Sequence, residues 1–170
     1  LVGSEMCIRD SLIDEDAEAA MLFADMVVED ARNIIRALGR GTPKRIVIYT
    51  APRSSYELLR RAFEFLEQGK QMRDFIRSVV AEARDRRRAA EEARRVYELA
   101  IQVPEELRRY IARKGFLDEQ RVLSELRSYI ARQLGVTGIK VYRADDPSAP
   151  DLGGRKRAAL PTKPGIYMEF

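Results

Sequence analysis

A basic segment near the C-terminus carries the residue types best suited to a chemical role. Residues 153–165 read Gly-Gly-Arg-Lys-Arg-Ala-Ala-Leu-Pro-Thr-Lys-Pro-Gly, so a flexible double glycine precedes three consecutive cations and a further lysine. Lys and Arg side chains neutralise phosphates, and the release of condensed counterions drives their binding to nucleic acid. The candidate phosphate contacts are therefore Arg155, Lys156, Arg157 and Lys163. The alternative interpretation of this segment is a solvated surface loop.

The composition excludes most of the usual catalytic chemistry. The 170 residues include no His, no Trp and one Cys. A Ser-His-Asp or Cys-His triad, a His general base and a zinc site rich in His or Cys are therefore excluded. Without a histidine to activate it, Ser54 is interpreted as a helix cap. The acidic group Asp145, Asp146 and Asp151 could hold a hard cation, but its neighbouring prolines favour turns. We predict no catalytic residue and no metal site.

A second group of cations lies within residues 84–95 and has a different interpretation. Arg87 and Glu91 stand four residues apart, as do Arg88 and Glu92, and at this spacing opposite charges pair along one helix. A solvated, self-paired helix face is therefore favoured. Steering of phosphates toward the protein is the alternative.

Three short segments predict strands. Residues 45–50 are β-branched and apolar on both faces, which indicates a buried strand, whereas residues 139–143 and 166–170 alternate in polarity. The last strand follows Pro161 and Pro164, which cannot donate ladder hydrogen bonds, so it is placed at or near a sheet edge.

An edge strand could take part in recognising nucleic acid. Its free backbone N–H and C=O groups are able to meet the edges of unpaired bases. Tyr142 and Tyr167 lie on predicted strands that could face solvent, where their rings could stack on a base. Sequence-specific RNA recognition favours such unpaired bases.

Helical spacing of apolar residues predicts the remaining elements. The expected features are a helix over 12–39 closed by Gly39, a Ser54-x-x-Glu57 capping box, a helix from Met72 running on toward Ile101, a short helix with Pro104 in its first position, and a helix from the N-cap Asp118 to Gly135. Together with the strands they indicate an α+β fold. We expect a small three-stranded sheet with several packed helices, preceded by one helix from an upstream helical bundle.

The balance of acidic and basic residues changes sign along the chain. Residues 12–39 hold seven acidic and two basic residues, whereas residues 40–170 hold 28 basic and 18 acidic residues. Residues 40–43 are the predicted linker.

Residues 1–11 resemble a translated sequencing adapter and are expected to be disordered. No apolar stretch reaches the roughly 18 residues of a membrane span, and a single Cys makes no internal disulfide, which suits the cytoplasm.

Two segments resemble the C-terminal domain of archaeal-type leucyl-tRNA synthetases. Residues 44–51, Lys-Arg-Ile-Val-Ile-Tyr-Thr-Ala, are similar to its opening strand, and residues 153–169 are similar to its end. The extra Phe170 departs from the usual Glu ending. The resemblance implies that 12–39 is the last helix of the anticodon-binding bundle and that 44–170 is a tRNA-binding domain.

The family also implies a role for each candidate residue. The domain would hold the long variable arm of leucine tRNA, with Ile166, Tyr167, Met168 and Glu169 reading bases, largely through backbone groups. The four cations of the basic segment would hold phosphates. The rest of the synthetase would lie upstream and the protein would be a monomer.

The parent enzyme would join leucine to tRNA with ATP and Mg²⁺. The class I signatures His-Ile-Gly-His and Lys-Met-Ser-Lys-Ser do not occur in these 170 residues. The fragment itself is therefore expected to have no enzyme activity and no cofactor. Two alternatives stay open: a different RNA- or ribosome-binding module with a basic C-terminal loop, and a helical protein-interaction domain.

Overall fold

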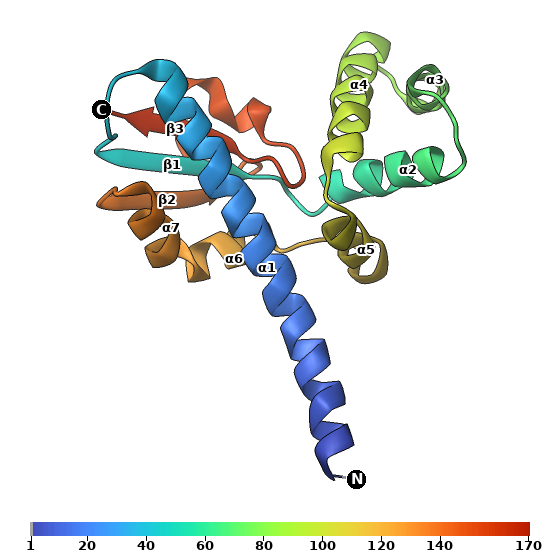
Figure 1. Cartoon of the computed structure of the whole chain (residues 1–170). Helices are drawn as coiled ribbons and strands as arrows, with labels where there is room; N and C mark the ends of the chain where they lie inside the picture. Colours follow the sequence, from blue (N-terminus) through green and yellow to red (C-terminus); the bar gives the residue numbers. More distant parts are fainter. Residues whose placement is uncertain (1) are drawn as a thin grey trace. The chain divides into compact units, whose positions relative to one another are not determined.

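The computed structural model describes the backbone of residues 2–170 and the side chains of residues 15–170. The chain forms two compact units (Figure 1). The sheet unit combines the chain up to Ala51 with Asp118–Phe170, and the helical unit is Pro52–Leu117. The helical unit is thus one continuous segment inserted between the two halves of the sheet unit.

The expected α+β class is confirmed, and the sheet unit contains the three predicted strands. These are β1 (Arg45–Thr50), β2 (Gly138–Arg143) and β3 (Gly165–Glu169), in the order β2-β1-β3. β1 pairs in parallel with β2 and antiparallel with β3. The central position of β1 explains its apolar residues on both faces, and β3 lies at an edge as its preceding prolines predict.

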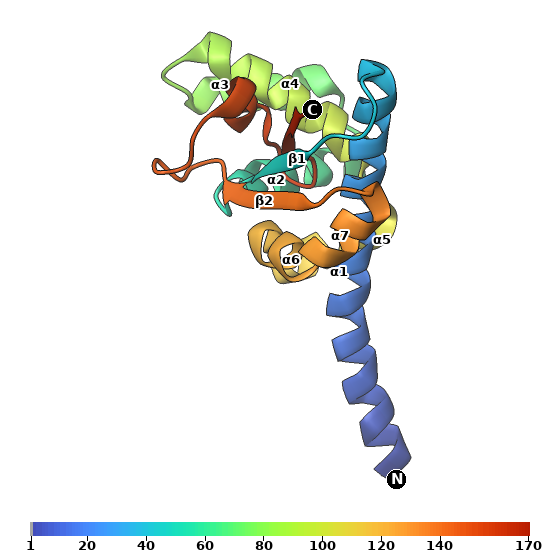
Figure 2. The same ribbon diagram turned by 90° about the vertical axis from the view of Figure 1, so that its left-hand side faces the viewer.

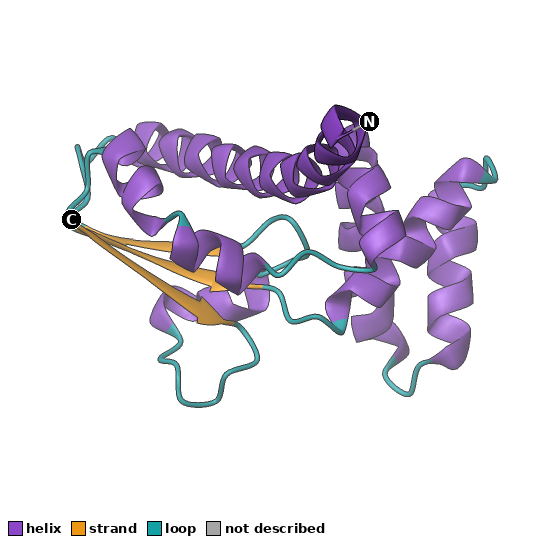
Figure 3. Cartoon of the chain, turned by 90° about the horizontal axis from the view of Figure 1, so that it is seen from below, coloured by secondary structure: helices purple, strands orange, loops and turns teal. Residues whose placement is uncertain are grey.

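The two faces of the sheet are covered by different elements. The helices α1 (Val2–Leu38), α6 (Glu119–Glu125) and α7 (Arg127–Leu134) lie on one face, and the 3₁₀ helix η1 (Leu152–Ala158) lies on the other (Figures 2 and 3). The register places Tyr49 opposite Tyr142, on the same face as Tyr167. Tyr49 contacts the segment that leads into η1, so these tyrosines belong to the η1 face.

Helix α1 packs within the sheet unit against α7 and α6. The Tyr129 hydroxyl of α7 donates to the Asp25 carboxylate at 2.7 Å, and Arg32 donates to Gln133 at 3.2 Å. The helix ends as predicted at Gly39, whose φ of 59° is left-handed. Whether this helix also closes an upstream bundle stays a prediction.

The backbone of α1 is helical back to Val2, which differs from the disorder expected for residues 1–11. Once a helix is nucleated, each added residue gains a hydrogen bond, so extension costs little. The side chains of residues 1–14 lie outside the described residues. The adapter interpretation of this stretch stays a prediction.

The helical unit consists of α2 (Ser55–Glu67), α3 (Met72–Glu82), α4 (Arg86–Gln102) and α5 (Glu105–Lys114). Helix α4 packs against both α3 and α2. The fully buried residues include Leu59, Phe75 and Leu107. Among the described residues, none of the helices of either unit is long and apolar enough to cross a membrane.

Three helix boundaries differ from the prediction. The single helix expected from Met72 is divided into α3 and α4, because Asp85 begins a new helix by accepting the Arg88 N–H at 3.1 Å. Ser54 has helical angles and makes no cap hydrogen bond, so the predicted capping box is wrong. Pro104 is the N-cap of α5 and not its first residue.

The predicted helix between Asp118 and Gly135 is also divided. Asp118 caps α6 as expected by accepting the Arg121 N–H at 3.3 Å, and Gly135 is left-handed as expected. Leu126 has φ −93° and ψ 12°, which ends α6 before α7 begins. A capping box that the sequence interpretation missed is formed by Gln71 and Asp74 at the start of α3.

Candidate nucleic-acid interface

The basic segment is folded against the edge strand. Residues predicted as a flexible loop form η1, which packs on β3. Gly153 and Gly154 have φ of 60° and 66°, a left-handed conformation that glycine adopts without strain. A Cβ at Gly153 would stand 3.1 Å from Cδ2 of Tyr167, so the absence of a side chain lets the tyrosine ring approach. The double glycine therefore shapes a defined turn.

Gly165 makes an equally close approach at the start of β3. A Cβ at this position would overlap the carbonyl oxygen of Arg155. The backbone of η1 thus lies directly on the edge strand, and the basic side chains project from the element that covers it.

The buried Tyr49 holds the segment that leads into η1. Its hydroxyl donates to the carbonyl oxygen of Pro150 and accepts the N–H of Leu152 at 3.1 Å. Its ring stacks on Tyr142 with the centroids 6.1 Å apart. Sequence reasoning placed Tyr49 in the core but missed this anchoring role, which joins residues about a hundred positions apart.

The four predicted phosphate contacts have different environments. Arg155, Arg157 and Lys163 are exposed. Lys156 is half-buried, its ammonium donates to the Asp146 carbonyl oxygen at 2.6 Å, and its N–H donates to Asp151 at 3.1 Å. Lys156 therefore holds the loop together, and the geometry favours the exposed cations as phosphate contacts.

Lys163 is held at the start of the edge strand by a tight turn. Leu160 and Lys163 exchange both backbone hydrogen bonds at 2.9 Å. Between them, Thr162 is buried and has a φ of 66°, a conformation rare for a β-branched residue. The turn directs the chain from η1 back into β3.

The predicted base-reading residues lie together on β3. The side chain of Ile166 is buried, so only its backbone could meet a base, while Tyr167 and Met168 are half-buried. The Glu169 carboxylate pairs with Arg45 at 2.8 Å, and its carbonyl oxygen accepts the Lys44 N–H at 2.7 Å. Glu169 is thus already engaged within the sheet unit.

The C-terminal residue Phe170 makes a cation–π contact with Arg40. The guanidinium carbon of Arg40 lies 5.0 Å from the centroid of the Phe170 ring. Together with the Arg45 and Lys44 contacts to Glu169, this cation–π contact holds the C-terminal end of β3 on the start of β1 and the segment before it.

Tyr142, the predicted stacking residue, is half-exposed on the other edge strand. Tyr49 covers one side of its ring. A base could therefore stack only on the remaining surface, and the role of Tyr142 stays a prediction.

The three loop carboxylates make the local contacts typical of turns. Asp145 accepts two hydrogen bonds from Arg143 at 2.9 and 3.0 Å, which lower the pKa of its carboxyl group. Hydrogen bonds from the Ser148 hydroxyl and N–H lower the pKa of Asp146. Within the described part of the chain, no group of three or more His, Cys, Asp and Glu residues is arranged to hold a metal ion.

The second basic cluster lies on α4. Arg87 pairs with Glu91 at 3.5 Å, and both side chains are highly exposed. This contact supports the interpretation of a solvated face whose charges pair along their own helix.

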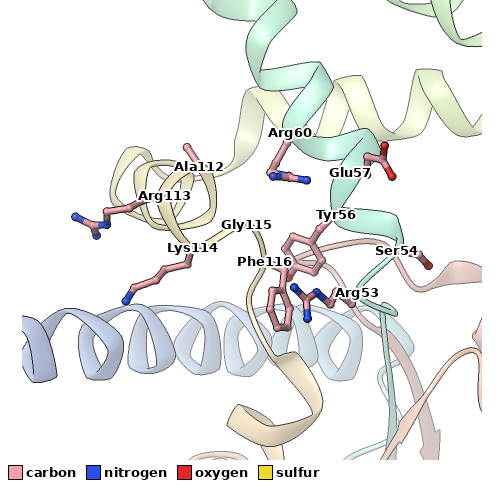
Figure 4. A pocket seen from close by; sticks show the side chains of 10 residues that line it. All are labelled: Arg53, Ser54, Tyr56, Glu57, Arg60, Ala112, Arg113, Lys114, Gly115 and Phe116. Carbon is pink, nitrogen blue, oxygen red and sulfur yellow. The ribbon is translucent and has the colours of Figure 1, made fainter.

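A pocket in the helical unit was not foreseen (Figure 4). It has a volume of about 650 Å³ and lies between the start of α2 and the end of α5. Arg53, Arg60 and Arg113 line it together with Tyr56 and Phe116. Because the two sides are separated by two helices in the sequence, no local pattern could have brought these residues together.

Comparison with known proteins finds leucine--tRNA ligases among the relatives of this chain. No family model matches the chain. A leucine--tRNA ligase of Pyrobaculum islandicum is 40% identical over 157 residues, which are 90% of this chain and 15% of that protein. The ligase of Ignicoccus hospitalis is 32% identical over 162 residues, 94% of this chain and 14% of that protein.

A third relative, leucine--tRNA ligase 1 of Sulfolobus acidocaldarius, is 32% identical over 140 residues, 82% of this chain and 14% of that protein. The chain thus spans about 15% of the length of the curated relatives it matches. The resemblance to archaeal leucyl-tRNA synthetases is confirmed along most of the sequence.

Proposed function

We propose that this chain, which matches a segment of archaeal leucine--tRNA ligases, is the tRNA-binding C-terminal part of such an enzyme and holds the long variable arm of leucine tRNA. The observation that carries the proposal is the edge strand β3 with exposed cations beside it. An edge strand has backbone groups free on one side, and cations next to it would hold the phosphates of the same nucleotides.

Phosphate binding and base recognition are assigned to different residues of this surface. Exposed Arg155 and Lys163 supply phosphate affinity, which is independent of sequence. Those backbone groups of Ile166, Tyr167 and Met168 that point away from β1 supply base recognition. Lys156 and Tyr49 act indirectly, because they hold the loop from which the cations project.

The chain would contribute affinity and specificity to a larger enzyme. In that enzyme, leucine is attached to tRNA with ATP and Mg²⁺ by the remaining part of the protein. We propose no cofactor for this chain and a cytoplasmic location, as befits a component of translation.

Binding to leucine tRNA and to the same tRNA without its long arm tests the proposal. In a gel shift, the full chain should bind the intact tRNA more tightly, and deletion of residues 166–170 should remove the difference. Equal affinity of the unmodified chain for the two RNAs would contradict the proposal.

Because β3 is part of the sheet, the deletion is complemented by side-chain variants. The double variant Arg155→Ala and Lys163→Ala should weaken binding to both RNAs and reduce the log–log salt slope by about two. The control is Arg87→Ala on α4, an exposed arginine already paired with Glu91. If Arg87→Ala weakened RNA binding as much as the double variant, the affinity would depend on total charge and not on cations beside β3.

A further inference from the structure

The pocket of the helical unit has no role in the proposed function. Its walls come from the turn before α2, the first turns of α2 and the end of α5, all inside the helical unit. At about 650 Å³ it lies within the range of roughly 300–1,000 Å³ typical of small-ligand sites. The lining therefore indicates what kind of ligand it would take.

The lining is strongly cationic. Four cations, Arg53, Arg60, Arg113 and Lys114, face a single carboxylate, Glu57. Among the described residues Arg60 takes part in no hydrogen bond or ion pair, and its Nη1 lies 3.8 Å from the position of a Cβ on Gly115. An exposed guanidinium without a partner, beside other cations, favours an anionic ligand.

One end of the pocket is flat and aromatic. The guanidinium of Arg53 lies 4.2 Å from the centroid of the Phe116 ring, and Tyr56 meets the same ring edge-on at 6.4 Å. Tyr56 is buried, so Phe116 packs against a ring that is fixed in the core. A guanidinium layered on an aromatic ring offers a planar surface of the kind on which nucleobases stack.

The cations are spread along the pocket. Figure 4 shows Arg53 next to Phe116, Arg60 projecting from α2 nearby, and the side chains of Arg113 and Lys114 pointing outward from α5, away from Arg60. One phosphate could not contact all of them. Successive phosphates of a nucleic-acid strand could, because a positively charged groove follows a backbone.

We propose that this pocket binds a nucleotide unit of single-stranded RNA, with the base on the Arg53–Phe116 stack, one phosphate on Arg60 and the following phosphates of the strand reaching the cations of α5. The proposal rests on the proposed function for the choice of RNA as the ligand. It uses different elements from the β3 surface and would give the chain a second contact with RNA.

A fluorescein-labelled hexauridylate, which has no stable secondary structure, is the probe. Its binding to the full chain is measured by fluorescence anisotropy at several salt concentrations. Arg60→Gln should weaken binding about five-fold and lower the salt slope by about one. The matched control is Arg77→Gln on α3, an exposed helical arginine outside the pocket, which should leave both quantities unchanged.

Phe116→Leu separates stacking from charge. It should weaken binding about five-fold while leaving the salt slope unchanged, because no phosphate contact is removed. Uridine monophosphate, inorganic phosphate and polyglutamate serve as competitors. Displacement of the probe by uridine monophosphate as efficiently as by unlabelled hexauridylate would overturn the assignment to a strand. Equally efficient displacement by phosphate or polyglutamate would overturn the assignment to a nucleotide.

Failure of this inference is distinguishable from failure of the proposed function. If the chain prefers the long-armed tRNA but Arg60→Gln behaves like Arg77→Gln, the pocket proposal is wrong and the proposed function stands. If hexauridylate binding depends on Arg60 and Phe116 but the long arm makes no difference, the pocket proposal is supported and the proposed function is wrong.

Discussion

The sheet unit and the helical unit differ in how far apart in the sequence their contacting elements lie. In the sheet unit, β1 pairs with strands that follow it only after the whole helical unit has intervened. In the helical unit, α2 to α5 follow one another without interruption. Contacts in the sheet unit therefore join segments on either side of the helical unit, such as Tyr49 and Pro150, whereas contacts in the helical unit join helices of one continuous segment.

The same contrast applies to the charges. In the sheet unit, Lys156 is used to fix the loop that presents the exposed cations. On α4, Arg87 pairs with a glutamate one turn away. The loop that carries Arg155 is also held by the distant Tyr49, so the fold sets the position of its cations relative to the strand edge.

Two glycines should show the largest contrast. Gly165→Ala would drive a Cβ into the carbonyl oxygen of Arg155 and should cost about 3 kcal/mol of the sheet unit's unfolding free energy. Gly69→Ala in the helical unit meets open space and suffers only its left-handed φ of 67°, at about 1 kcal/mol. Native-state hydrogen exchange measures both units in one chain. Faster exchange of the β1 amides in Gly69→Ala than in Gly165→Ala would contradict the comparison.

Two buried tyrosines should show a smaller contrast. Tyr49→Phe leaves the Pro150 carbonyl and the Leu152 N–H without their partner and should cost about 2 kcal/mol. Tyr97→Phe in the helical unit removes one hydrogen bond, to the Lys70 carbonyl at 2.8 Å, and should cost about 1 kcal/mol.

The tyrosine variants also test whether the loop that carries Arg155 determines RNA binding. Tyr49→Phe should weaken binding of leucine tRNA, because it loosens the loop that carries Arg155. Tyr97→Phe should leave that binding unchanged. Gel shifts with both variants check this, and an equal loss in the two would show that overall stability, and not the loop, determines affinity.

Lowering the pH should change the free energy of unfolding least, and the change should come from carboxylates of the sheet unit. Hydrogen bonds lower the pKa values of Asp145 and Asp146 below the usual 3.8. The resulting stabilisation is complete above the unfolded pKa and is lost as the pH falls through the lower folded pKa. Asp145 is exposed and Asp146 is only half-buried, so solvent screens both groups and the effect is small.

Urea unfolding of the unmodified chain and of Asp145→Asn, followed from pH 6 down to about 2, measures this contribution. The unmodified chain should be slightly more stable at pH 6, and the two curves should converge at the acid end. A constant difference across the range would indicate that the Arg143–Asp145 contact does not depend on ionisation.

Much of the sheet unit could be predicted from local sequence. The β-branched run of β1 indicates a strand buried on both faces, and the prolines before β3 indicate an edge. Asp118 and Gly135 predict helix boundaries for the same reason, since capping and left-handed turns involve only neighbouring residues. Apolar residues at helical spacing continue across Asp85 and Leu126, so the helices predicted there were longer than those in the structure.

By itself, the sequence determined the three strands, the approximate position of the helical segments and a basic segment suited to phosphates, because these depend on residue types at short spacing. Only the tertiary structure decided that η1 lies on β3, that Lys156 is engaged by Asp146 and that Arg53, Arg60 and Phe116 share a pocket. These contacts join different elements and loops, not residues one or two helical turns apart. The free energy of such contacts comes from packing and hydrogen bonds between elements, and no local pattern encodes which elements will meet.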